Sequence, residues 1–501
     1  MNRSRTSQRR TLLLLTLGAI LAAPDDSLSK QSGTRQQRRP APAAAPRSDA
    51  PGSRAAEAQA LLREAAAHLQ AGRLEEAAAL VRRALAAAPG SADAHNLMGV
   101  LMDQRGETGA AEREYLEALR LNPRAVSPRA NLGVLLARSG RSREAIETFE
   151  TVLREAPGHP QASFNLALQY AARGDYGRAV ELFERLAAAG PPAFEVLYNL
   201  GTALYHLNRF ERAAAVLEAA AALVPASPWP PHYLGLIASA EGRSEEAVAF
   251  WQKALDLRAE LPEANFMIGE ELRKHLRYEG AAEFYERALK QDPAKLVYYV
   301  RLGGIYMLLV RFDQALEVFQ RAAERFPGIA EAHYFVGLAA RAKAMYEMAE
   351  AAFRRSLALR PDNVDALAQL GFLSGERGAY AEAERLLRRA VTLGDKHFYA
   401  HYDLGRLLVK TRRYEEAVPV LQRGAALCPV NPGVHYQLFM ALSRLKRKEE
   451  AGREELLFKS LEEDRKRRHD GADICQADQT GELPAVAVPS NPATPPAART
   501  P

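Results

Sequence analysis

The sequence predicts an all-α solenoid of about twelve stacked helical hairpins. Three series of residues, each recurring every 34 positions, support this fold class. Small residues, nearly all glycine, form the first series between Gly99 and Gly405. Alanine forms the second, without exception, from Ala77 to Ala451, and proline forms most of the third, from Pro89 to Pro429. Such a period indicates a chain in which each copy contacts only its neighbours, rather than three separate globular domains.

One copy, residues 126–159, shows how each element is predicted. Apolar residues recur at helical spacing on both sides of a break near Ser139 and Gly140, which favours two helices. Gly133 and Ala145 lack bulk, so the two helices are expected to approach closely there, with Phe149 filling the remaining groove. Pro157 should end the second helix, because proline lacks an N–H and clashes with the preceding turn.

Acidic residues are expected to begin several of the second helices. Glu245 and Glu246, which follow Ser244, are an example that suits the positive end of the helix dipole.

The two ends of the chain have a different composition. Residues 1–23 combine four arginines with a short apolar run, which is typical of a secretory signal peptide. Residues 24–54 are rich in Pro, Ala and Arg, and residues 465–501 are rich in polar residues and Pro, so both are predicted to be disordered. The solenoid is therefore predicted over residues 55–464, with a degenerate capping copy from residue 432, in an exported protein that is periplasmic or secreted if bacterial.

The basic character of the chain belongs to its ends. The formal net charge is +6 and the isoelectric point is about 9.2. Residues 1–54 carry a balance of +7 and residues 465–501 a balance of +1, which leaves −2 for residues 55–464. We therefore expect no nucleic-acid partner and, once the signal is removed, no segment that spans a membrane.

Catalytic and metal-binding motifs are not recognisable in the sequence. His397 and His401 are four residues apart, but no acidic third ligand supports a metal site. His401 also belongs to a phase, shared with His95, for which core packing is the expected role. The two cysteines, Cys428 and Cys475, are predicted to be unpaired thiols rather than one bridge. We expect no enzyme activity and no cofactor.

The repeated pattern resembles that of the tetratricopeptide repeat (TPR) family. The residues that match its consensus in one copy are Tyr299, Leu302, Gly303, Tyr306, Ala315, Phe319, Ala322 and Pro327. The resemblance extends over about residues 58–465 and implies a right-handed superhelix whose first helices line a concave groove. The array is also similar to the repeat portion of O-linked N-acetylglucosamine transferases, without their catalytic domain.

The resemblance places particular side chains in or beside the groove. Asn131, Asn165 and Asn199 share one phase and could form an amide ladder that holds a peptide backbone, although they could equally cap local hydrogen bonds. Aromatic and basic residues continue this surface and could instead pack against the next repeat. They are Tyr198, Tyr205, Trp229, His232, Phe266, Arg273, Tyr334, Phe372, Tyr402 and Arg406.

These features predict a scaffold or adaptor that binds peptide or protein segments in its groove. The alternative is a non-catalytic subunit that presents substrates to a glycosyltransferase or to a secretion or envelope assembly machine. A third class, a polysaccharide binder, would use Trp229 and the tyrosines as stacking faces. The sequence does not define the oligomeric state.

Overall fold

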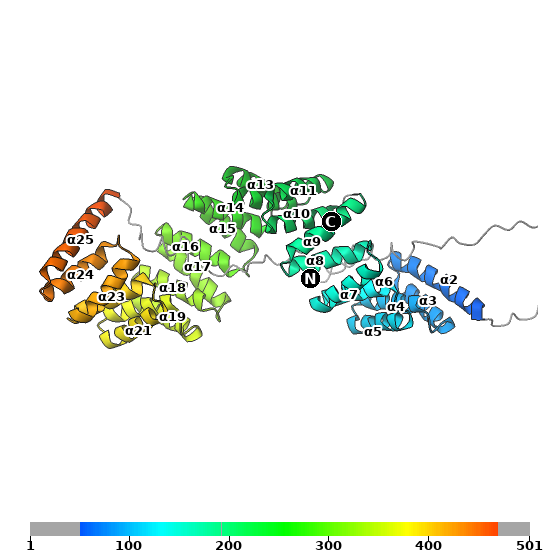
Figure 1. The fold of residues 1–501 in the computed structure, drawn as a ribbon, viewed down its shortest axis with the longest axis horizontal. Helices are drawn as coiled ribbons and strands as arrows, with labels where there is room; N and C mark the ends of the chain where they lie inside the picture. Colours follow the sequence, from blue (N-terminus) through cyan, green and yellow to red (C-terminus); the bar gives the residue numbers. More distant parts are fainter. Residues whose placement is uncertain (1–50, 192, 469–501) are drawn as a thin grey trace, which may run out of the picture. The chain divides into compact units, whose positions relative to one another are not determined.

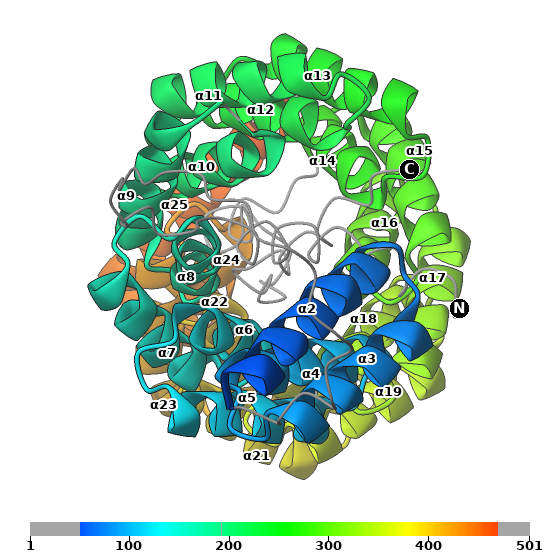
Figure 2. The ribbon, with the colours of Figure 1, turned by 90° about the vertical axis from the view of Figure 1, so that its right-hand side faces the viewer.

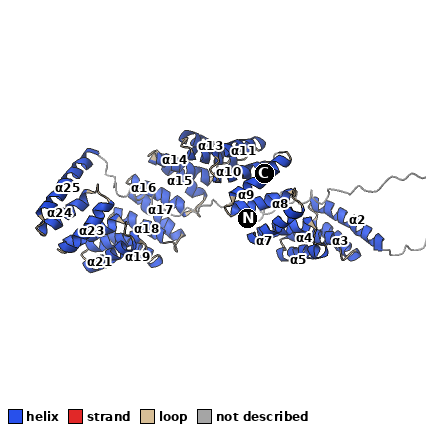
Figure 3. Ribbon diagram, in the orientation of Figure 1, coloured by secondary structure: helices blue, strands red, loops and turns tan. Residues whose placement is uncertain are grey.

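The computed structural model of the protein describes residues 51–191 and 193–468. Within these ranges the chain forms 24 helices and no strand. This confirms the predicted all-α solenoid, whose helices are drawn in Figures 1 and 3. The predicted signal peptide, residues 24–50 of the spacer and residues 469–501 of the tail lie outside the described residues. Helical structure begins at Pro51 and ends at Arg468, four residues beyond each predicted boundary.

The described residues divide into two units, residues 51–241 and residues 242–468. The helices of the first unit are α2 (Pro51–Gln70), α3 (Leu74–Ala87), α4 (Ala92–Arg105), α5 (Thr108–Leu121), α6 (Val126–Arg138), α7 (Ser142–Glu155), α8 (Pro160–Ala172), α9 (Tyr176–Ala189), α10 (Phe194–His206), α11 (Phe210–Leu223) and α12 (Trp229–Ala240). Those of the second are α13 (Ser244–Leu257), α14 (Pro262–Lys274), α15 (Tyr278–Gln291), α16 (Leu296–Leu308), α17 (Phe312–Arg325), α18 (Ala330–Ala342), α19 (Tyr346–Leu359), α20 (Val364–Glu376), α21 (Tyr380–Leu393), α22 (Phe398–Lys410), α23 (Tyr414–Leu427), α24 (Pro432–Arg444) and α25 (Lys448–Arg468).

Within each unit the helices lie in two layers. Even-numbered helices, the first of each hairpin, form one layer, and odd-numbered helices form the other; Figure 2 shows this for α4, α6 and α8 against α5, α7 and α9. Successive first helices approach one another closely, as α4 and α6 do in the first unit and α20 and α22 in the second. Side chains of neighbouring copies can therefore meet in the layer of first helices.

The repeated glycine is required by the packing of its own hairpin. A Cβ atom built on Gly133 would lie 2.5 Å from Cε1 of Phe149, and one on Gly269 would lie 2.7 Å from Cε1 of Tyr285. Phe149 and Tyr285 are fully buried. The predicted close approach, with a large residue filling the groove, is thus confirmed, because the ring occupies the space where a side chain would begin.

The predicted helix ends are also found. Helix α7 ends at Glu155 with Ala156 as its C-cap, so Pro157 is the first residue beyond it. Helix α13 has Glu245 and Glu246 in its first turn. The capping copy is a complete hairpin, whose second helix, α25, is longer than its counterparts at 21 residues.

In the copies that have one, the histidine of this phase ties the first helix to the turn before it. Nε2 of His401 lies 3.0 Å from the carbonyl oxygen of Asp395, and Nε2 of His435 lies 2.9 Å from that of Pro429. Both rings are buried. Nδ1 of His435 also lies 2.7 Å from Glu454 in α25. These side chains therefore combine core packing with a hydrogen bond to the preceding loop.

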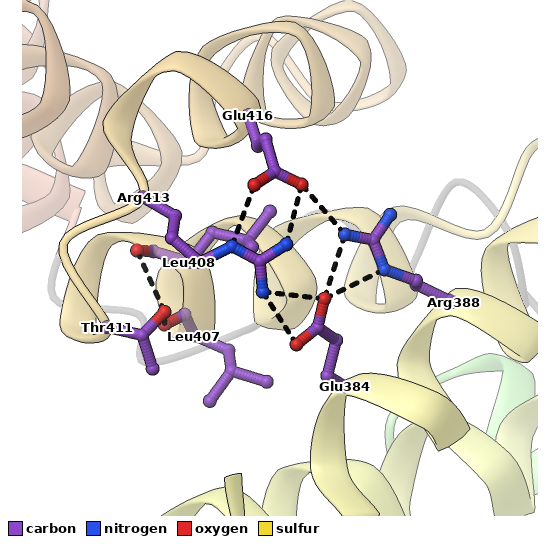
Figure 4. A network of polar contacts seen from close by, with 7 residues as sticks. All are labelled: Glu384, Arg388, Leu407, Leu408, Thr411, Arg413 and Glu416. Carbon is purple, nitrogen blue, oxygen red and sulfur yellow. Dashed lines mark hydrogen bonds and ion pairs between the residues drawn. The ribbon is translucent and has the colours of Figure 1, made fainter. Parts of the chain in front are cut away.

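Ion pairs connect the second helices of neighbouring hairpins. Arg413, at the start of α23, donates two hydrogen bonds of 2.7 Å to Glu384 of α21 and two of 2.7 Å to Glu416 (Figure 4). Arg388 also donates to both carboxylates, at 2.9 Å. The hydrogen bonds from Arg413 and Arg388 lower the pKa of Glu416 below its ordinary value. Each charge in this network faces two opposite charges, which links the two hairpins.

One sequence prediction is wrong. Cys428 is disulfide-bonded rather than a free thiol. The sequence has one other cysteine, Cys475, which lies outside the described residues. The prediction failed because spacing along the sequence does not show which segments come close in space.

No helix within residues 51–191 and 193–468 combines the length and apolar character needed to cross a bilayer.

Candidate functional site

A pocket of about 280 Å³ opens between α20 and α22 in the second unit. Its walls come from the first helices of two adjacent hairpins, with one leucine from α21 between them. The lining residues are Gly371, Phe372, Gly375, Glu376, Leu387, Asp403, Arg406, Leu407 and Lys410. Phe372 and Arg406 were predicted from the sequence as groove residues, and the structure brings them together here.

Gly375 lines this space without a side chain. The same phase carries Tyr205, Arg273 and Arg341 in other copies. A Cβ atom on Gly375 would meet only Ala383 and Leu407, at 3.7 and 3.8 Å, which are ordinary van der Waals distances. The backbone therefore does not require glycine at this position, and a larger side chain would extend into the pocket.

The aromatic wall lies between two guanidinium groups. Cζ of Arg406 lies 4.8 Å from the centroid of the Phe372 ring, and Cζ of Arg341 lies 5.6 Å from it. Nη2 of Arg406 also lies 3.2 Å from Glu376 and 3.6 Å from Asp403. Stacking on an aromatic ring and ion pairing together hold Arg406 in one orientation.

Asp403 is a buried carboxyl at this site, with a relative exposure of 9%. Burial raises its pKa from 3.8 to about 7, although the positive charges of Arg406, Arg341 and His397 oppose the rise. Glu376 adds to the increase through its negative charge. The carboxyl is therefore only partly ionised near neutral pH.

The pocket combines cationic groups with apolar surface. Arg341, Arg406 and Lys410 supply three cationic groups, whereas Glu376 and a partly ionised Asp403 supply the negative charge. Phe372, Leu387 and Leu407 supply apolar surface. The chemistry of this pocket suits a short apolar stem that ends in an anionic group.

The three predicted ladder residues make separate contacts. Nδ2 of Asn131 donates a 3.0 Å hydrogen bond to Oδ1 of Asn96 in the preceding hairpin, and both amides are buried. Nδ2 of Asn165 donates to the carbonyl oxygen of Gln161 at 2.8 Å. Nδ2 of Asn199 donates to that of Glu195 at 2.7 Å. Each amide therefore uses one of its two N–H donors within the chain, which leaves the other N–H and the acceptor oxygen for a ligand.

The predicted aromatic residues of the first unit form a packed cluster. The rings of Tyr198 and Tyr205 lie 5.8 and 5.7 Å from the ring of Tyr233, both edge-on. Trp229 packs edge-on against His232 at 6.2 Å. Burial lowers the pKa of His232 to about 4, so its imidazole is neutral at pH 7. Trp229 is 9% exposed and therefore presents little of its face to a sugar.

The remaining predicted residues lie elsewhere in the second unit and do not join the pocket. Rings that pack within the solenoid are Phe266 against Tyr298 at 5.0 Å, Tyr334 against Phe353 at 5.8 Å, and Tyr402 against Phe398 at 5.7 Å. Arg273 forms an ion pair with Glu270 at 3.2 Å, and Glu270 also accepts a 2.9 Å hydrogen bond from Arg301. Of these contacts, Phe266 with Tyr298 and Glu270 with Arg301 join the first helices α14 and α16, and the others lie within one helix or one hairpin.

Sequence reasoning missed Asp403 and Gly375. Asp403 stands two residues before Gly405, which is the phase that identified Asn131, Asn165 and Asn199. Following that phase through the later copies would have found it. Gly375 carried a weaker signal, because its importance lies in an absent side chain.

Comparisons with known proteins support the repeat assignment. One family model described as a tetratricopeptide repeat matches residues 43–92, 62–126, 96–160, 130–194, 164–228, 234–295 and 375–432, which together are more than half of the chain. Two further models with the same description match residues 272–344 and 330–363. A comparison with curated proteins found no match. The predicted likeness to O-linked N-acetylglucosamine transferases stays a prediction.

Three solved structures illustrate the similarity in fold. YrrB, described as a TPR protein with an unusual peptide-binding site, is 23% identical over 37% of this chain and 96% of its own, with a TM-score of 0.34. The Cut9–Hcn1 hetero-tetramer of the APC/C is 12% identical over 82% of this chain and 95% of the matched chain, with a TM-score of 0.42. Yeast Tom70 is 15% identical over 85% of this chain and 99% of its own, with a TM-score of 0.35.

At these identities and scores the structural likenesses carry no information on function. The family models, which cover most of the repeats, decide the assignment. The chain belongs to the tetratricopeptide repeat family.

Proposed function

We propose that the protein is an exported interaction scaffold that holds a peptide or protein segment on its first helices. The pocket between α20 and α22 carries this proposal, because it joins an aromatic wall to positive charge at the meeting of two hairpins. A partner segment would insert an acidic side chain, whose carboxylate pairs with Arg406 or Arg341 while its stem lies against Phe372.

Blocking the pocket tests this function. Gly375→Leu should reduce capture of acidic peptides at least about tenfold, because the leucine would occupy the space that the ligand side chain needs. A peptide array containing Glu, Gln and Lys at the inserted position, read by fluorescence polarisation, would measure the effect. Gly452→Leu is the matched control, since a side chain on this helical glycine of α25 would meet no atom within 4 Å. If Gly375→Leu and Gly452→Leu bound the acidic peptides equally well, the pocket would not be their binding site.

Two features support export. The first 23 residues have the basic and apolar segments of a signal peptide, and Cys428 is disulfide-bonded, which is typical of an oxidising compartment. The full chain, expressed in a host with a periplasm, should therefore be recovered outside the cytoplasm without its first residues. Its cysteines should react with maleimide only after reduction. Recovery of an intact N-terminus together with two reactive thiols would contradict export.

A further inference from the structure

Arg341 of α18 is a cation for which the described residues provide no counter-charge. Other arginines of the second unit pair with carboxylates of a neighbouring hairpin, as Arg354 does with Glu382 at 3.1 Å. Within the described ranges the guanidinium of Arg341 makes no ion pair and no hydrogen bond, and it lies over the ring of Phe372 instead. None of its nitrogen atoms is sealed from water. The group can therefore bind an anionic partner from outside the chain.

Arg341 and Arg406 approach the same aromatic ring from different hairpins. Helices α18, α20 and α22 are successive first helices, so Arg341 reaches Phe372 from the preceding hairpin and Arg406 reaches it from the following one. Their Cζ atoms lie 5.6 and 4.8 Å from the centroid of the ring. These two distances set an upper limit of 10.4 Å on the separation of the two guanidinium carbons.

The two cations differ in how their charge is balanced. Arg406 pairs with Glu376 at 3.2 Å and with Asp403 at 3.6 Å, so both carboxyl groups that line the pocket lie beside it. Arg341 has the ring of Phe372 alone. A cation–π contact compensates a partly buried charge less well than a hydrogen-bonded carboxylate does. A negative group of a ligand would therefore complete the site beside Arg341.

The shared ring narrows the class of ligand. Nucleotide bases bind by stacking on open aromatic faces, whereas two guanidinium groups already approach the ring of Phe372. A single compact anion beside Arg406 would leave the charge of Arg341 unbalanced. The arrangement instead suits two negative groups that are carried, a short distance apart, on one chain.

An extended peptide with two acidic residues meets this requirement. Residues i and i+2 of an extended chain point to the same face and lie about 7 Å apart, which is within the limit of 10.4 Å between the guanidinium carbons. Adjacent residues point to opposite faces, so two consecutive acidic residues could not reach both cations at once.

We propose that the pocket and Arg341 together recognise a pair of acidic side chains separated by one residue. One carboxylate pairs with Arg406 inside the pocket, and the other pairs with Arg341, so that the two side chains lie on either side of Phe372. This inference rests on the proposed function and names the chemistry of the partner segment.

Short capped peptides test the motif on the full chain. A fluorescein-labelled peptide with Glu-Ser-Glu should bind about tenfold more tightly than its Glu-Ser-Gln and Gln-Ser-Glu analogues in fluorescence polarisation. A Glu-Glu-Ser isomer of equal charge should bind like the analogues with one Glu. Acetyl and amide caps remove the terminal charges, so only the side chains can supply carboxylates.

Arg341→Gln should abolish the preference for Glu-Ser-Glu. It should change the affinity for the single-Glu peptides by no more than about twofold, because Arg406 remains. Arg341→Lys keeps the positive charge and should retain most of the preference. Since the guanidinium of Arg341 makes no ion pair, the melting temperature of Arg341→Gln should match that of the wild type.

Arg389→Gln is the charge-matched control. Arg389 is exposed on α21 and forms no ion pair within the described residues, so its loss should leave the preference unchanged. A wild type that binds Glu-Ser-Glu no better than the single-Glu peptides would overturn the inference and leave the proposed function intact. The same holds if the preference survives in Arg341→Gln, or if Arg389→Gln abolishes it equally. If every peptide binds Gly375→Leu as well as the wild type, the proposed function fails and the inference fails with it.

Discussion

Gly303→Leu is expected to lower the free energy of unfolding of the second unit by about 3 kcal/mol. A Cβ atom at this position would overlap the ring of Phe319, which is 1% exposed and packed inside the core. The remaining atoms of leucine would force apart the two helices of the α16–α17 hairpin. Because each hairpin also packs on its neighbours, the loss should reduce the cooperativity of unfolding around this copy. Urea denaturation, monitored by circular dichroism, would measure the free energy and the cooperativity of unfolding of the variant and of the wild type.

Gly303→Ala should have a much smaller effect, within about 1 kcal/mol of the wild type. Ala167 occupies the same phase in the first unit, and Phe183, sixteen residues later, remains fully buried. One Cβ atom is therefore tolerated after a small shift of the ring, and alanine gains helix propensity over glycine. Gly177→Leu, where no atom lies within 4 Å of the added Cβ, serves as the size-matched control. If Gly177→Leu lowered the free energy of unfolding as much as Gly303→Leu does, the packing explanation would be contradicted.

The features predicted from the sequence are those set within one copy. Examples are Gly133, the ring of Phe149 and the proline after α7, which act through local packing and backbone chemistry. The sequence shows each of them repeatedly, because they recur every 34 residues. The helices and their ends follow from these residues.

Features that depend on several segments were not predicted. The division after Glu241 leaves no sign in the period, because the phase continues through it. The pocket requires Asp403 and Phe372 from adjacent copies together with the missing side chain of Gly375. The disulfide bond of Cys428 depends on proximity in space. The ten aromatic and basic residues predicted for the groove therefore include both pocket residues, such as Arg406, and buried residues, such as Tyr334.

Asp403→Asn should stabilise the second unit at alkaline pH. A carboxyl whose pKa is about 7 when folded and 3.8 otherwise binds protons more tightly in the folded state. The free energy of unfolding of the wild type should therefore fall as the pH rises from about 4 to about 7, and remain low above that. Each pH unit between these values corresponds to about 1.4 kcal/mol, which gives a cost of about 2–4 kcal/mol at pH 8. Asparagine has a similar shape and does not titrate.

Thermal and urea unfolding at pH 4 and pH 8 would measure the difference in stability between Asp403→Asn and the wild type. We expect the asparagine variant to match the wild type at pH 4 and to exceed it at pH 8. Asp362→Asn, at an exposed position, should show no comparable gain. An asparagine variant whose gain in unfolding free energy over the wild type is the same at pH 4 and at pH 8 would show that the pKa of Asp403 is not raised in the folded state.

A destabilising carboxyl in the wall of a pocket points to a role other than folding. Asp403 lies 3.6 Å from the guanidinium of Arg406, which it helps to hold against Phe372. Asp403→Asn should therefore gain stability and lose affinity for acidic peptides at pH 8, because Arg406 is released from one of its two ion pairs. The two effects have opposite signs, so an affinity loss could not be attributed to unfolding. Higher stability with unchanged affinity would remove Asp403 from the binding site.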